Sequence, residues 1–443
     1  MEFVDPYTIL IEASVIIILS FFFGEISKRT NVPSVLMLIM LGILLQYALE
    51  YFGMADLNFF PILEILGIIG LIMIVLEAAL ELKLERDKYL SIGIALTVAL
   101  IGLLLSTWAA AEILEYFIEG MTTQSAWLYA TPLSILSSAI IIPSVTGLKG
   151  PKKEFHIYES TFSDILGIML FYFLTSQLPI DQTAAGAENL DVVEHTGTGG
   201  LAYLGNVLLT IVVSLIASYG IVLIFQNIKS HVKLFLLIAV LLLLYAVGKK
   251  LHLSSLIIVL IFGLLIANMK LFFRGPLRKI LNYKQAMHIY EGLHVVTVET
   301  AFVVRTFFFV IFGVTITLAS LWSVDVAIVS LLIILSIYVI RFVILRIFIG
   351  SDILPQLFVA PRGLITILLF YAIPTEANIE NFEPGILLFI IIGTSLIMTL
   401  AMVVDKKRTT SAIRRVKSAP IGYEKWKAPT LTETATAKEV EQH

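Results

Sequence analysis

Apolar residues along this chain gather into long runs that are separated by short polar connections. The runs cover residues 7–27, 33–50, 61–82, 90–114, 127–148, 157–178, 201–226, 234–249, 254–270, 290–318, 325–349, 357–373 and 385–404. Most have about the 20 residues that an α-helix needs to cross a bilayer. The pattern therefore predicts an all-α polytopic membrane protein with thirteen transmembrane helices, or twelve if the short run at 234–249 does not span.

Charges in the connections predict how the chain is oriented. Connections after runs one, three, five, seven and nine and the start of the C-terminal tail are basic, and those after runs two, four, six and twelve are mainly acidic, with Lys249 and Lys250 as the exception. Basic connections stay on the cytoplasmic side of a membrane. We therefore predict an N-terminus outside and a C-terminus inside, which requires an odd number of spans and supports thirteen. The expected location is the plasma or inner membrane.

Composition agrees with a membrane protein and excludes several functions. The chain is 58% hydrophobic and only 14% charged, has no cysteine and carries a net charge of -3. Soluble domains are near 25% charged. Thiol chemistry is excluded, and neither nucleic acid nor a nucleotide is an expected partner. We divide the chain into a transmembrane domain, 1–404, and a flexible polar cytoplasmic tail, 405–443; the acid-rich stretch 179–200 reads as an outer loop.

Two runs at matching positions are interrupted by proline. Runs one to six and eight to thirteen form two six-helix halves, and an offset of seven inverts one half relative to the other. The fifth run of one half contains Pro143. The fifth run of the other contains Pro361, two residues before Gly363. Proline disrupts the preceding helical turn. Paired interruptions in inverted halves indicate the binding site of a transporter.

Asp164 lies inside the run 157–178, where a carboxylate costs about 3 kcal/mol or more. Ser160 is one turn away on the same helix face. A carboxylate beside hydroxyls suits a hard cation such as Na⁺, and it can also take a proton. We therefore predict that a cation and a proton compete for Asp164, which is the minimum machinery of an antiporter.

Other charged residues inside the runs need partners of their own. We predict that Glu159 forms a structural ion pair with Arg362, since breaking one partner of a buried pair costs about 3–5 kcal/mol. We expect Arg305 to be a structural or gating charge, with Glu299 as its nearest counter-charge. Glu77, which is followed by small residues, is a candidate to line the cytoplasmic access to the site.

These residues resemble motifs of the monovalent cation:proton antiporter superfamily, and the NhaP-type sodium/proton antiporters within it. The family's Glu-Ser-x-x-Asn-Asp is similar to Glu159-Ser160-Thr161-Phe162-Ser163-Asp164. Its run on the third helix resembles Leu76-Glu77-Ala78-Ala79-Leu80-Glu81, and its Leu-Arg-Gly resembles Pro361-Arg362-Gly363. The likeness covers roughly residues 7–404.

The resemblance implies the NhaA-like antiporter fold, in which the two unwound helices cross. It implies a homodimer, with a dimerisation part and a six-helix core that includes 61–178 and 290–404, and an elevator-like movement of the core. It implies a transporter that serves pH homeostasis rather than an enzyme, with no cofactor. The cation and proton would bind at Asp164, assisted by Ser160, Ser163, Glu77, Ser137 and Ser138.

Two departures from the family bear on the transported ion. Ser137-Ser138-Ala139 stands where the family has Thr-Asp-Pro, and Ser163 stands where it has Asn. A single titrating carboxylate predicts electroneutral exchange of one Na⁺ for one proton. The less charged ring of oxygens leaves K⁺/H⁺ exchange, as in the potassium-efflux branch, as an alternative, and Li⁺ as another cation to test.

Two rivals from other classes remain. A passive cation channel would conduct current without stoichiometric proton movement. An intramembrane aspartyl protease needs two facing aspartates, and Asp164 is the only aspartate clearly inside a predicted span.

Overall fold

The computed structural model describes most of the chain, and its regular structure is helical. The described residues are 6–30, 33–51, 60–84, 86–148, 150–178, 200–226, 228, 233–250, 255–272, 283–315, 323–374, 377–379 and 381–417. The predicted loop 179–200 lies outside them except for residue 200, as does the tail beyond residue 417. Within a bilayer a helix satisfies its backbone hydrogen bonds internally, which explains why apolar runs of this length fold in this way.

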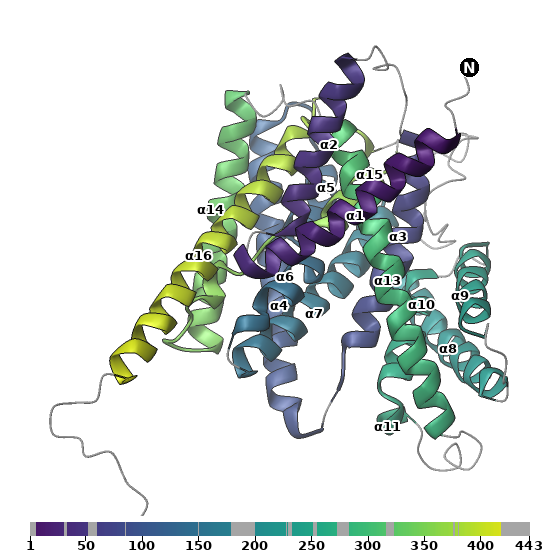
Figure 1. Ribbon diagram of the computed structural model, residues 1–443. Coiled ribbons are helices and arrows are strands. Elements are labelled where there is room, and N and C mark those ends of the chain that lie inside the picture. The colour runs from purple at the N-terminus through teal and green to yellow at the C-terminus, as the bar shows by residue number, and fades with distance from the viewer. Residues whose placement is uncertain are drawn as a thin grey trace, which may run out of the picture. The chain divides into compact units, whose positions relative to one another are not determined.

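The helices follow the predicted runs closely (Figure 1). They are α1 (Pro6–Thr30), α2 (Ser34–Tyr51), α3 (Phe60–Glu81), α4 (Tyr89–Phe117), α5 (Thr123–Ser134), α6 (Ser138–Ser144), α7 (Gly150–Thr175), α8 (Gly200–Phe225), α9 (Lys233–Lys250), α10 (Ser255–Ala267), α11 (Met269–Phe272), α13 (Tyr283–Thr315), α14 (Val324–Phe348), α15 (Leu364–Tyr371) and α16 (Gly385–Lys417), with short 3-10 turns at Arg86–Lys88 (η1), Val145–Gly147 (η2) and Gln356–Phe358 (η5). The predicted fold class is confirmed.

Some helix ends differ from the ends of the apolar runs. α7 begins at Gly150 rather than at residue 157, because Pro151 suits the first turn of a helix and the polar residues after it continue the same helix. α16 continues to Lys417, so the first part of the predicted flexible tail is helical. Hydropathy indicates the segment of a helix that lies within the bilayer, and not the whole length of the helix.

Both proline-containing runs are interrupted helices. In the first, Ile135, Leu136 and Ser137 separate α5 from α6. In the second, residues 359–363 are without regular structure between η5 and α15. Pro143 lies inside α6 rather than at the break, so the proline indicated the right helix but not the residues that unwind.

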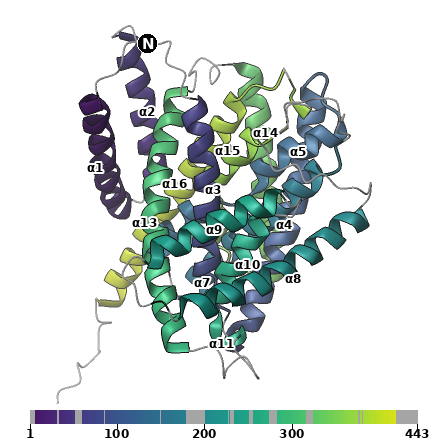
Figure 2. The ribbon, with the colours of Figure 1, turned by 90° about the vertical axis from the view of Figure 1, so that its right-hand side faces the viewer.

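The membrane helices pack in two groups. In the first group α4 packs on α5, α7 and α14, and an apolar cluster joins α4, α5 and α14 to the start of α16. In the second group α13 packs on α2 and α3, while α10 packs on α3, α8 and α9; Figure 2 shows α8, α9 and α10 together. Contacts between the groups are fewer, and α3 and α15 provide several of them.

The predicted core included α3 and α13, which here pack in the second group. Small residues explain the difference. A Cβ added to Gly263 of α10 would lie 2.6 Å from the Cβ of Ala79 on α3, and one added to Gly70 of α3 would lie 3.1 Å from Val304 of α13. Small residues let membrane helices approach closely, and here they fasten α3 to the second group.

The closest helix contact in the second group is between α2 and α13. A Cβ added to Gly42 of α2 would lie 2.8 Å from the Cα of Gly313 on α13. A Cβ added to Gly313 would meet the backbone of Ile39 and Gly42 in return. The two backbones therefore touch, and neither position has room for a side chain.

Candidate functional site

The two interrupted helices meet at their unwound residues. The backbone N–H of Ser137 donates to the carbonyl oxygen of Pro361 over 3.0 Å. A Cβ added to Gly363 would lie 2.9 Å from the Cβ of Ser137. This hydrogen bond and this close approach bring together the two breaks that the sequence predicted, and the site is built around them.

Replacing Gly363 by alanine should separate the two breaks. The φ of Gly363 is -159°, which any residue can adopt, so the effect comes from space alone. Overpacking of this kind costs about 1–3 kcal/mol, and we expect a lower melting temperature and slower transport. Gly147→Ala is the matched control, because a Cβ there meets nothing within 4 Å. Equal behaviour of the two variants would contradict the close contact.

Asp164 lies at the first break, where α6 begins. Its side chain is 1% exposed, and its Oδ2 accepts a hydrogen bond from the backbone N–H of Ser138 over 3.3 Å. Its Oδ1 is buried and has no hydrogen-bond partner. Among the described residues, no Lys, Arg or His lies within ion-pair distance of this carboxyl group. One buried oxygen therefore remains available to a ligand.

Arg362 lies at the second break and is bound by backbone carbonyl groups. Its Nε donates to the carbonyl oxygen of Leu133 over 2.8 Å, and its Nη1 donates to that of Ala360 over 3.0 Å. Leu133 belongs to the last turn of α5, where carbonyl groups lose their helical partners. The positive charge of Arg362 thus offsets the negative end of α5, while Asp164 lies at the positive end of α6.

Glu159 pairs with Arg341 of α14, so the predicted ion pair with Arg362 is wrong. Arg341 Nη1 donates to Glu159 Oε1 over 2.7 Å, and Nη2 donates to Oε2 over 2.9 Å. Both side chains are buried, at 8% and 1% exposure. Arg341 also donates to the carbonyl oxygen of Gln356 in η5 over 3.1 and 3.2 Å. The pair therefore joins α7 and α14 to the second interrupted helix.

Arg305 pairs with Glu77, and not with Glu299. Its Nη2 lies 2.9 and 3.3 Å from the two carboxylate oxygens of Glu77. Its Nη1 donates to the carbonyl oxygen of Ala139 in α6 over 3.4 Å. Glu299 is exposed. Glu77 and Arg305 belong to the second helix group, and they contact the first group next to Ser138, the residue that binds Asp164.

Two of the predicted cation ligands form other contacts. The Ser160 hydroxyl donates to the carbonyl oxygen of His156 on its own helix over 2.7 Å. The Ser163 hydroxyl accepts from the backbone N–H of Leu136 over 3.0 Å and so holds the first break. Of the predicted set, Ser138 forms a hydrogen bond with Asp164. Ser137 instead contacts Pro361 at the second break.

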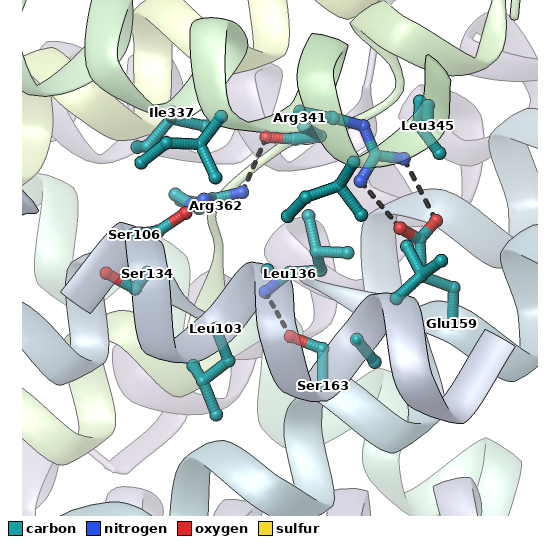
Figure 3. Close-up of a pocket in the computed structure, with 16 residues that line it drawn as sticks. Leu103, Ser106, Ser134, Leu136, Glu159, Ser163, Ile337, Arg341, Leu345 and Arg362 are labelled. Atoms are coloured by element: carbon teal, nitrogen blue, oxygen red, sulfur yellow. Dashed lines mark hydrogen bonds and ion pairs between the residues drawn. The ribbon is translucent and has the colours of Figure 1, made fainter. Parts of the chain in front are cut away.

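Two cavities are lined by neighbours of Asp164. The first is lined by Ser106, Ser134, Ser163, Glu159, Arg341 and Arg362 (Figure 3). The second is lined by Glu77, Glu81, Ser138, Ala139, Pro143 and Arg305. Asp164 lines neither cavity, but its neighbour Ser163 lines the first and its hydrogen-bond donor Ser138 lines the second.

Sequence reasoning missed the role of Arg341 and of Thr394. The hydroxyl of Thr394, on α16, accepts from the backbone N–H of Arg362 over 3.1 Å and holds the second break in place. A signal for Arg341 exists, because an arginine deep in the apolar run 325–349 needs a buried carboxylate. Thr394 carries no such signal.

Interrupted helices that meet beside a buried carboxylate, within a bundle of membrane helices, define a secondary transporter of ions. The transmembrane model of the sodium/hydrogen exchanger family matches residues 15–406, and the chain belongs to this family. The predicted relationship is thereby confirmed, and the family is one of membrane transporters.

The chain is also similar to solved structures of the sodium proton antiporter MjNhaP1 from Methanocaldococcus jannaschii. The structure at pH 8 is 20% identical with a TM-score of 0.60, and the match covers 89% of this chain and 95% of that one. An electron-microscopy structure of the same antiporter is 19% identical with a TM-score of 0.59, over 95% and 100% of the two chains. Both share the fold. No curated protein matches the sequence.

Proposed function

We propose that the protein exchanges Na⁺ for H⁺ across the cell membrane and that both ions compete for Asp164. The observation that carries this proposal is the open oxygen of Asp164. It is the buried carboxylate that lacks an ion-pair partner among the described residues, and its Oδ1 has no hydrogen bond. A carboxylate in such a place is neutralised either by a proton or by a cation.

Pairing of the two other acids near the breaks supports electroneutral exchange. Glu159 is neutralised by Arg341, and Glu77 by Arg305. Asp164 is then the one acidic group of these three whose charge changes during the cycle. The site holds one proton or one Na⁺ at a time, so each cycle exchanges equal charges and moves no net charge.

The two helix groups support alternating access by an elevator-like movement. Asp164, Arg362 and both breaks belong to the first group, while Glu77 and Arg305 line the second cavity from the second group. When the first group slides, Asp164 moves relative to the cavity that Glu77 lines. The other cavity is lined by the first group alone and moves with Asp164. Glu77 would therefore assist the cation on one side of the membrane only.

We expect the exchange rate to be independent of membrane voltage. Purified protein in liposomes would take up radioactive Na⁺ under a fixed pH step, with a potassium-diffusion potential of either sign set by valinomycin. The same potassium gradient without valinomycin is the control, because it separates the effect of voltage from competition by K⁺. A rate that follows the imposed potential would show that the cycle moves charge.

Potassium is the second candidate cation, because the oxygens around Asp164 are weakly charged. Ser138 contacts the carboxyl group where the family has an acid nearby, and Glu77 is engaged by Arg305. Dequenching of a pH-sensitive dye in proteoliposomes, with Na⁺, K⁺ and Li⁺ added in parallel, identifies the cation. Dequenching by K⁺ but not by Na⁺ would replace the sodium assignment.

A further inference from the structure

His156 is a buried imidazole with an open proton acceptor. It lies in the second turn of α7, has 0% exposure, and places Nδ1 3.3 Å from Oε2 of Glu159. A carboxylate in an ion pair can only accept hydrogen bonds. In the neutral ring Nδ1 therefore carries the hydrogen, and Nε2 keeps its lone pair. Nε2 is buried and has no hydrogen-bond partner.

The carboxylate oxygen that faces His156 is also an oxygen that holds Arg341. Glu159 Oε2 accepts from Arg341 Nη2 over 2.9 Å while it faces the imidazole. Arg341 in turn holds the carbonyl oxygen of Gln356, just before the second break. A charge on the imidazole therefore acts on the same atom that anchors Arg341, and through Arg341 on the interrupted helix.

We propose that His156 and Glu159 form a second proton-binding site, separate from Asp164. The charged groups that act on His156 in the described structure are Glu159 and Lys152 of its own helix and Arg341 of α14. Burial and the two cations oppose the imidazolium, and Glu159 favours it. Lys152 is itself engaged by Asp352 over 2.9 Å. Glu159 lines the first cavity (Figure 3).

Protonation of His156 draws Oε2 away from Arg341. The cluster of His156, Glu159 and Arg341 then changes from no net charge to one positive charge in a buried place, and the hold of Arg341 on η5 weakens. Because η5 positions the second break, exchange slows. Acid conditions thus inhibit the protein twice, once at Asp164 and once at this second site.

The first test reads the imidazole directly and does not need exchange activity. A variant in which the other six histidines are replaced by glutamine leaves His156 as its only imidazole. Its ¹⁵N Nε2 resonance, followed in nanodiscs from about pH 8.5 to about pH 5, should move from the unprotonated to the protonated position. A resonance that stays constant over this range would overturn the proposal, whatever the fate of the Asp164 assignment.

The second test is the pH profile of exchange in His156→Gln. Two protonations should give the wild-type rate an acid limb with a slope of about two, and the variant a slope of about one. His288→Gln is the matched control, because His288 has the same spacing to Glu291 at 3.7 Å but is 78% exposed. We expect the control to follow the wild type. Superimposable profiles of wild type and His156→Gln would overturn the link to transport.

Discussion

Asp164→Asn abolishes cation-dependent proton flux and leaves the protein folded. Asparagine has nearly the shape of aspartate, so the hydrogen bond from Ser138 and the packing of α7 remain possible. The amide neither binds a proton nor carries the negative charge that would neutralise a bound cation, so the exchange step is lost. Proton flux from variant liposomes, measured with a pH-sensitive dye, should equal that of empty liposomes at every Na⁺ concentration.

The control for this experiment is Asp325→Asn. Asp325 is an exposed aspartate in the first turn of α14, remote from both breaks in the sequence. Its replacement removes the same charge from the chain but should leave flux unchanged. Retained Na⁺-dependent flux in Asp164→Asn, at normal levels of folded protein, would refute the assignment of the site.

Arg341→Met destabilises the protein by about 3–5 kcal/mol, because it leaves Glu159 as a buried charge without a cation. It also removes both donors from the carbonyl oxygen of Gln356. We expect a much lower melting temperature in detergent. Adding Glu159→Gln to this variant should recover part of the loss, since the pair then disappears as a unit.

Arg346→Met supplies the comparison within the same helix. Arg346 is exposed and donates to the carbonyl oxygen of Gly350 at the end of α14. Loss of an exposed contact of this kind costs less than about 1 kcal/mol. If Arg346→Met lowered the melting temperature as much as Arg341→Met does, the buried pair would not be the source of the stability.

The positions of the helices could be predicted from the sequence because lipid leaves the backbone little choice. An apolar run of about 20 residues becomes a helix in a bilayer, and the matching prolines indicated which helices are interrupted. The same pattern predicts that Asp164 lies inside a helix, although not that it lies at the first break. The resemblance implies that the two unwound helices cross, and in the structure the backbone N–H of Ser137 donates to the carbonyl oxygen of Pro361.

The partners of the buried charges could not be predicted in the same way. Glu159 could reach an arginine on either α14 or the second break, and only the packing of α7 selects Arg341 over Arg362. For Arg305 we chose Glu299 because it is near in sequence. Six residues place the two side chains about 120° apart around a helix, so that choice ignored helix geometry. The partner, Glu77, comes from a different helix.

The backbone contact between α2 and α13 determines which helices can slide past each other. With no side chains between Gly42 and Gly313, sliding along this contact would force the next turn into the facing main chain. The two helices are therefore expected to move together as one rigid body. Between the groups, α15 meets α3 through the side chain of Leu368 near Gly67. In the proposed elevator-like movement, shear between the groups would fall on such methyl contacts, which can rearrange one rotamer at a time.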